Sequence, residues 1–185
     1  MPEEKGENFF TELLKFALIA VVIVVPVRLF IAQPFIVSGA SMSPTFESGE
    51  YLIVDELSYR LGEPERLDVI IFRYPRNPEE FFIKRVIGLP GETVQIVGDS
   101  ITITTKGGGT LSLEEPYIKN HGNGGVFRVE LGEDEYFVLG DNRPESSDSR
   151  VWGELPRENI IGRAFLRLLP LQHLGVLPGA ATIQK

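Results

Sequence analysis

The sequence contains no cysteine and only two histidines among 185 residues. Neither disulfides nor thiolate metal sites are therefore available. His121 lies in a glycine-rich stretch and His173 in the apolar C-terminal part, so a histidine-based metal site is not indicated and we expect no cofactor. Basic residues are also scarce: 18 Lys and Arg stand against 26 Asp and Glu, for a net charge of -8. This balance argues against a nucleic-acid partner.

An apolar segment near the N-terminus decides the class of protein. Residues 16–27 carry no charge, and Leu13–Ala32 makes about 20 residues, or about 30 Å of helix, which matches the hydrocarbon core of a bilayer. We expect a transmembrane anchor at residues 13–32 after an N-terminal cytoplasmic tail at residues 1–12. A cleaved secretory signal and a buried helix of a soluble protein are the alternatives. No convincing cleavage pattern follows the segment.

Residues 33–185 are expected to form a mostly β domain, because short apolar stretches alternate with Gly and Pro turns. Strands are predicted at residues 35–37, 50–54, 68–72, 81–87, 135–139 and 160–168, with a helical turn at 55–59 and a loop at 75–78. Residues 94–104 have the pattern of a hairpin that turns at Gly98-Asp99. This hairpin predicts a smaller β region at about residues 89–130.

Ser41 is a candidate nucleophile directly after the apolar segment. A serine hydroxyl needs a neighbour that takes its proton, and a lysine kept neutral by burial can do so. The surrounding sequence is not a Gly-x-Ser-x-Gly elbow, since Ser43 stands at the last glycine position. A loop or capping serine is the alternative interpretation.

Lys84 is the candidate base. Strand alternation places it on one face with Phe82 and Val86, while Arg85 belongs to the other face. Flanking apolar groups remove water from an ammonium and lower its pKa. A decrease of about two units raises the neutral fraction at pH 7 roughly a hundredfold. The alternative is an exposed lysine on an edge strand.

A polar run, Gly140–Arg150, follows the predicted strand at residues 135–139. Asp148 and Arg150 are placed to form an ion pair, and a serine of this run could bond the neutral lysine amine. Such a run suits a shell of residues that orients a catalytic base. A solvated loop with capping serines is the alternative.

In this order, the apolar segment and the polar clusters resemble the bacterial type I signal peptidases, or leader peptidases, a family with a Ser-Lys dyad. Residues 38–45 resemble the nucleophile box, 84–92 the lysine box and 140–150 the final box, while 67–70 resemble a Gly-Asp-Val box with Leu67 in place of glycine. The resemblance implies an N-terminal transmembrane helix followed by a signal-peptidase-like β-barrel or sandwich core with a smaller inserted β region.

The resemblance also implies roles for individual residues. Ser41 would be the acylating nucleophile and supply part of the oxyanion hole through its main-chain N–H, with Lys84 as general base. Supporting roles would fall to Ser146, which would hold the Lys84 amine, to the structural pair Asp148 and Arg150, and to Asp141 as the partner of Arg85. Gly39 stands where the best-known Gram-negative members carry a serine hydroxyl, so no second oxyanion donor is assigned.

The implied activity is that of a membrane-bound serine endopeptidase that removes signal peptides from secreted preproteins. Its partners would be membrane lipids and secretory preproteins that emerge from the translocation machinery, with the catalytic domain on the extracytoplasmic face of the cell membrane. Phe35, Phe46 and Trp152 are candidates for pocket walls or lipid contacts. The alternatives are a self-cleaving repressor-type protease, which needs a DNA-binding N-terminal domain, and an inactive membrane-anchored β module that binds peptides.

Overall fold

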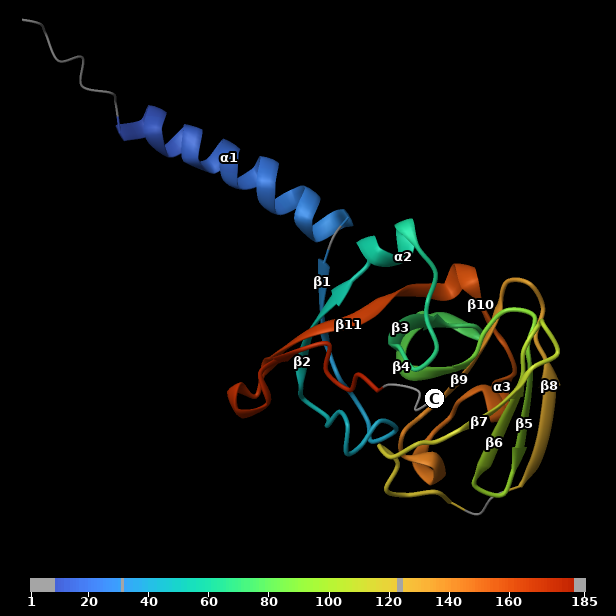
Figure 1. Ribbon diagram of the computed structural model, residues 1–185. Coiled ribbons are helices and arrows are strands. Elements are labelled where there is room, and N and C mark those ends of the chain that lie inside the picture. The colour runs from blue at the N-terminus through green and yellow to red at the C-terminus, as the bar shows by residue number, and fades with distance from the viewer. Residues whose placement is uncertain (1–8, 31, 123–124, 182–185) are drawn as a thin grey trace, which may run out of the picture.

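The computed structural model describes residues 9–30, 32–122 and 125–181. A long helix, α1 (Phe9–Phe30), projects from a body that contains two antiparallel β-sheets (Figure 1). The body confirms the expectation of a mostly β domain. Part of the predicted N-terminal tail, residues 1–8, lies outside the described residues.

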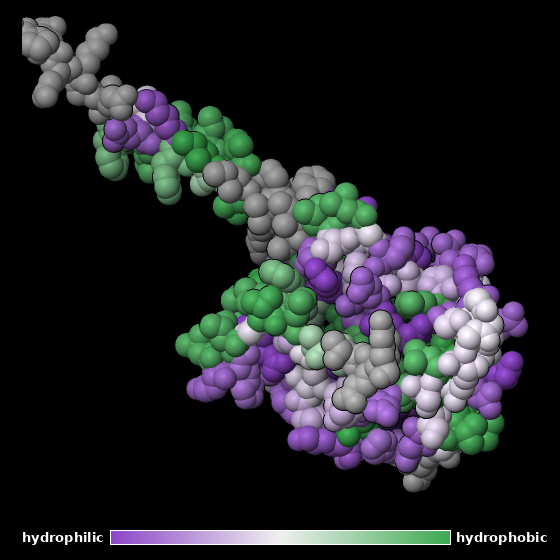
Figure 2. Space-filling view, in the orientation of Figure 1, coloured by the Kyte–Doolittle hydropathy of each residue, from purple (hydrophilic) through white to green (hydrophobic). Residues whose placement is uncertain are grey.

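Helix α1 is apolar over most of its surface. Its described large apolar side chains are between 51% exposed at Leu13 and 79% exposed at Phe10, and Figure 2 shows them as a green surface along the helix. Within the part of the chain that the structure describes, no helix is long and apolar enough to cross a membrane. The predicted segment 13–32 is thus helical up to Phe30, and strand β1 begins at Ala32. Its function as a membrane anchor remains a prediction.

The main sheet contains eight of the described strands in the order β1-β2-β11-β3-β4-β9-β10, with β12 paired to β11. Their bounds are β1 Ala32–Ile36, β2 Tyr51–Asp55, β3 Val69–Tyr74, β4 Asn77–Gly88, β9 Glu135–Leu139, β10 Leu155–Pro156, β11 Ile160–Leu169 and β12 Gly175–Val176. The path ends at β1 on one side and at the two-residue β10 on the other, so these strands do not close into a ring. Of the predicted barrel or sandwich core, the closed barrel is therefore corrected to an open main sheet.

A second, four-stranded sheet lies beside the main one. Its strands are β5 Thr93–Val97, β6 Ser100–Thr104, β7 Thr110–Leu113 and β8 Val126–Glu130, in the order β7-β6-β5-β8. The predicted hairpin is present as β5 and β6. Alternate side chains of these two strands are buried against Ile87 and Phe137 of the main sheet. The sequence prediction did not include β7 and β8, which are short strands next to glycine-rich stretches.

Short helices connect the strands: α2 Leu57–Leu61, η1 Arg143–Glu145, α3 Ser149–Trp152, η2 Arg157–Asn159 and η3 Leu171–His173. The helical turn predicted at residues 55–59 lies two residues further on, as α2. The loop predicted at residues 75–78 is also shorter than expected. Tyr74 pairs with Asn77 across the hairpin, so Pro78 belongs to β4 and only two residues form the turn.

The second half of strand β4 is buried and carries the alternation that the sequence predicted. Val86 packs in a cluster with Phe72 and Trp152, and Phe82 packs against the same cluster. On the other face of the strand, Ile83 packs against a cluster around Phe46. Lys84 therefore lies on the face of Phe82 and Val86, at the buried centre of the sheet.

Gly88 ends β4 where the two sheets meet. An added Cβ would lie 2.5 Å from Val94 Cγ2 and 2.7 Å from Leu131 Cδ1. We expect Gly88→Ala to lower the free energy of unfolding by about 1–3 kcal/mol, the usual cost of overpacking a core. Urea unfolding followed by the fluorescence of the single tryptophan measures the change. Gly107→Ala is the control, because a Cβ there meets nothing within 4 Å; equal stability of the two variants would contradict the packing.

Candidate active site

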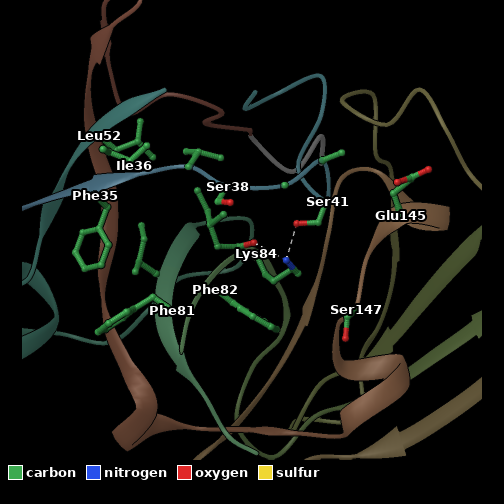
Figure 3. Close-up of a pocket in the computed structure, with 15 residues that line it drawn as sticks. Phe35, Ile36, Ser38, Ser41, Leu52, Phe81, Phe82, Lys84, Glu145 and Ser147 are labelled. Atoms are coloured by element: carbon green, nitrogen blue, oxygen red, sulfur yellow. Dashed lines mark hydrogen bonds between the residues drawn. The ribbon is translucent and has the colours of Figure 1, made fainter. Parts of the chain in front are cut away.

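Ser41 and Lys84 meet in space although they are 43 positions apart in the sequence. Lys84 Nζ lies 2.7 Å from Ser41 Oγ, and Figure 3 shows the two side chains pointing toward each other. Lys84 Nζ also donates to the carbonyl oxygen of Ile83 at 2.8 Å. Ser41 belongs to the loop of residues 38–46 that follows β1, which we call the serine loop. The arrangement joins a hydroxyl and an amine at hydrogen-bond distance.

The surroundings of Lys84 favour its neutral form. The residue is 4% exposed, and its Nζ lies 5.3 Å from the centroid of the Phe82 ring. Burial lowers the pKa of Lys84 to about 8, against the opposing influence of the carboxylates of Asp148 and Asp141, which raise it. With a pKa of about 8, roughly one lysine in ten is neutral at pH 7. Lys84 can therefore accept a proton near neutral pH.

The pair between Asp141 and Arg85 that the resemblance implied is formed. Arg85 Nε and Nη2 donate to Asp141 Oδ1 and Oδ2 at 2.9 and 2.6 Å, and both side chains are at most 1% exposed. Asp141 Oδ2 also accepts the hydroxyl of Thr45 at 2.6 Å. The buried ion pair is thereby linked to the serine loop.

Asp148 and Arg150 also form their predicted pair. Arg150 Nε and Nη2 donate to the two oxygens of Asp148 at 2.8 Å each. Asp148 is fully buried, caps α3 by accepting from the backbone N–H of Arg150, and accepts the N–H of Gly140 at 3.1 Å. One carboxylate thus fixes the start of α3 against the end of β9.

An open cleft of about 260 Å³ lies beside Ser41 and Lys84. Figure 3 shows aromatic and aliphatic side chains at one end of the cleft and Glu145 and Ser147 beyond the dyad at the other. Its apolar side chains include Phe35, Ile36, Leu52, Phe81 and Phe82. Of the aromatic candidates from the sequence, only Phe35 lines the cleft. Phe46 and Trp152 are 0% and 7% exposed and belong to the core.

Comparison with known proteins identifies the family to which the chain belongs. A family model described as "Signal peptidase, peptidase S26" matches residues 10–169. The chain belongs to the signal peptidase family. It is 40% identical over 182 residues to "Signal peptidase I" of Leptolyngbya laminosa, which covers 95% of this chain and 87% of that protein. It is also 37% identical over 180 residues to "Probable signal peptidase I-2" of Synechocystis sp., covering 95% of this chain and 80% of that protein.

A relative from Bacillus gives the same family. The chain is 36% identical over 169 residues to "Signal peptidase I" of Bacillus caldolyticus, covering 84% of this chain and 89% of that protein. These findings confirm the resemblance from the sequence and make the chain a type I signal peptidase, a hydrolase.

Ser146 of this signal peptidase does not hold the Lys84 amine as expected. Its Oγ is buried without a hydrogen-bond partner among the described residues. It lies against Gly140, where an added Cβ would be 2.2 Å from Ser146 Oγ. Lys84 Nζ bonds Ser41 and the Ile83 carbonyl instead, and Ser147 is the serine of this run that lines the cleft.

Two residues that hold the serine loop were not assigned from the sequence. Asn142 donates its backbone N–H to the Ser41 carbonyl at 3.0 Å and its side-chain amide to the Ala40 carbonyl at 3.1 Å. Thr45 bonds Asp141 through its hydroxyl and accepts from Arg167 Nη2 through its carbonyl at 2.9 Å. Both residues stand inside the motifs of the signal peptidase resemblance. Their polar side chains beside Asp141 and Pro44 were the available signal.

We expect Lys84→Met to stabilise this signal peptidase near neutral pH. Because the pKa of Lys84 falls from 10.5 to about 8 on folding, the unfolded chain binds more protons between these values, and wild-type stability rises with pH across that window. Below pH 8 the buried ammonium costs about 3 kcal/mol. Two lost hydrogen bonds offset about 1 kcal/mol each, which leaves a net gain of about 1 kcal/mol.

Urea unfolding of wild type and Lys84→Met between pH 7 and pH 10 measures this effect. The advantage of the variant should shrink and reverse as the pH rises, since the folded amine is neutral above pH 8 and the desolvation cost falls as the pH approaches the unfolded pKa of 10.5. A stability difference that does not change over this range would show that the lysine carries no desolvation cost.

Proposed function

We propose that this chain removes signal peptides from secretory preproteins by acyl-enzyme catalysis, with Ser41 as the nucleophile and Lys84 as the general base. The observation that carries the proposal is the 2.7 Å contact between Lys84 Nζ and Ser41 Oγ. The lowered pKa of Lys84 supports it, because a base must be neutral before it accepts a proton.

The chemistry follows from this contact. Lys84 takes the Ser41 proton while Oγ attacks the scissile carbonyl. The oxyanion of the tetrahedral intermediate accepts a hydrogen bond from the main-chain N–H of Ser41. The protonated Lys84 then donates its proton to the leaving amine, which yields an acyl ester on Ser41. The neutral lysine next takes a proton from water, the hydroxide attacks the ester, and the proton returns to Ser41 Oγ.

The cleft supports a peptide substrate. Residues 38–40 line the cleft next to Ser41, and the side chains of Ser38, Gly39 and Ala40 have at most two heavy atoms. Apolar side chains of β1, β2 and β4 line the rest of the cleft. An extended peptide with small residues at the first and third positions before the cut is the substrate that we propose for this cleft.

The proposal includes attachment to the cell membrane through α1. The family is generally membrane-associated, and a helix that is apolar all round suits lipid when protein does not cover it. Helix α1 carries exposed apolar side chains and is followed by β1, which leads into the wall of the cleft. A preprotein held in the bilayer by its own signal segment would thereby reach Ser41 on the extracytoplasmic face. Preproteins and membrane lipids are thus the proposed partners.

Ser41→Ala and Lys84→Ala test the assignment directly. Each variant loses a group that changes its bonding in the transition state, so we expect cleavage of a preprotein in detergent to fall by about 10⁴-fold or more. Mass spectrometry of the product identifies the cut. Ser112→Ala and Lys106→Ala are matched controls on exposed positions of the second sheet region. If Ser41→Ala cleaved the preprotein at the wild-type rate, Ser41 would not be the nucleophile. If the wild-type protein bound the peptide without cleaving it, the protein would be a peptide-binding module.

The pH dependence provides an independent test. Only the neutral form of Lys84 accepts the serine proton, and its pKa is about 8. We expect kcat/KM to rise about tenfold per pH unit below pH 7 and to level off above about pH 8–9. Initial rates between pH 6 and pH 9.5, with folding checked at each pH, measure the profile. A flat profile across this range would exclude a lysine base with the pKa given above.

A further inference from the structure

A C-terminal segment outside the matched family region 10–169 lies against the serine loop. We call residues 177–181 the C-terminal strap. Figure 1 shows the strap, in red, as it turns back from the η3 end of β11 across the body of the protein. Leu177 N donates to the Phe165 carbonyl at 2.6 Å, and Ala180 N donates to the Leu177 carbonyl at 3.1 Å. Ala181 packs against the core cluster that contains Ile87.

The strap is bonded to the buried arginine of the site. Arg85 Nη1 donates to the Gly179 carbonyl at 2.7 Å, while Nε and Nη2 of the same guanidinium hold Asp141. Asp141 in turn accepts the hydroxyl of Thr45 in the serine loop. A chain of three hydrogen-bonded contacts therefore runs from the Gly179 backbone to the residue four positions after Ser41.

The strap also touches the serine loop directly. Gly179 has φ +76°, and an added Cβ would lie 2.7 Å from Thr45 Cγ2 and 3.0 Å from Phe46 Cε2. Phe46 is fully buried, so it has little freedom to move away. Only glycine satisfies both this conformation and this close approach.

We infer that Gly179 is a positioning residue. The C-terminal strap packs against Thr45 and Phe46 and accepts a hydrogen bond from Arg85, and so keeps Ser41 Oγ at hydrogen-bond distance from Lys84. The inference rests on the proposed function of Ser41 and Lys84. A shift of about 1 Å in a catalytic group can cost about a hundredfold in rate. Arg167 holds the Thr45 carbonyl independently of the strap, so a displaced strap is expected to move the serine loop without unfolding it.

Gly179→Ala in the full chain tests the inference. We expect kcat for preprotein cleavage to fall about tenfold or more. KM should change less than kcat, because Gly179 itself is not among the residues that line the cleft. The pH profile should also move to higher pH, since displacement of Ser41 admits water to Lys84 and its pKa rises toward the ordinary value. A loss of stability alone would lower the active fraction and leave KM and the pH profile unchanged.

Two glycines provide matched controls. Gly175→Ala adds a methyl group in the same C-terminal region, where the nearest atom lies 3.9 Å away. Gly98→Ala introduces a left-handed alanine at φ +60° in open space, on the hairpin of the second sheet. We expect both controls to keep the wild-type kcat and pH profile, although Gly98→Ala should lower the melting temperature.

Thr45→Ser adds a rescue experiment and a second variant in case Gly179→Ala folds poorly. Serine keeps the hydroxyl that bonds Asp141 and removes the methyl carbon that the new Cβ would meet first. The double variant Gly179→Ala/Thr45→Ser should therefore recover part of the kcat lost in Gly179→Ala, and part of the stability.

Each outcome supports or overturns the inference. It is overturned if Gly179→Ala keeps the wild-type kcat, if its activity loss equals its unfolded fraction with an unchanged pH profile, or if Thr45→Ser gives no rescue. Ser41→Ala is assayed in parallel. An active Ser41→Ala variant would refute the proposed function itself, whereas an inactive Ser41→Ala beside a fully active Gly179→Ala would refute only the role of the strap.

Discussion

The burial of a single amine beside a serine hydroxyl is the constraint on which the rest of the site depends. Lys84 lies at the centre of the main sheet, where an ammonium loses most of its hydration. The desolvation cost of about 3 kcal/mol below pH 8 is a considerable part of the 5–15 kcal/mol that ordinarily stabilises a domain. The apolar residues that flank Lys84 on β4 offset it, because they supply core contacts on both faces of the strand. The strand that weakens the fold at one position stabilises it at the next.

Two buried carboxylates lie near Lys84, and without partners of opposite charge they would raise its pKa and favour the protonated amine. Asp141 and Asp148 both raise the pKa of Lys84, yet burial prevails and the value ends near 8. Each carboxylate is bonded through both oxygens to an arginine, Arg85 or Arg150. These pairs satisfy charges that would be costly to leave alone in the interior. Their net charge near zero also limits the field at the amine, so the ion pairs protect both the fold and the base.

The sequence predicted those features of the site that depend on neighbouring residues, and it missed those that depend on contacts between remote residues. The period-two pattern of β4 placed Lys84 on the correct face, because alternation depends only on neighbouring residues. The spacing within the polar run predicted the Asp148–Arg150 pair, and the family resemblance supplied the Asp141–Arg85 pair. The Ser146 contact was not formed, since that side chain packs against Gly140. The roles of Thr45 and Gly179 depend on contacts across about 100 residues, and no periodicity encodes such contacts. Open or closed pairing of the main sheet is likewise a property of all the strands together.

The serine loop shows why the dyad belongs to the whole fold rather than to one motif. No strand pairing holds Ser41 in place; its loop is held by Asn142 after β9, by Arg167 on β11, and by Asp141 with its partner arginine on β4. The acceptors and donors thus come from three different strands of the main sheet or their ends. A rigid sheet fixes their relative positions more closely than a flexible loop could fix its own conformation. The distance between Ser41 and Lys84 is therefore maintained by side chains remote in sequence. Small shifts of the strands in the main sheet would change this distance before the protein unfolds.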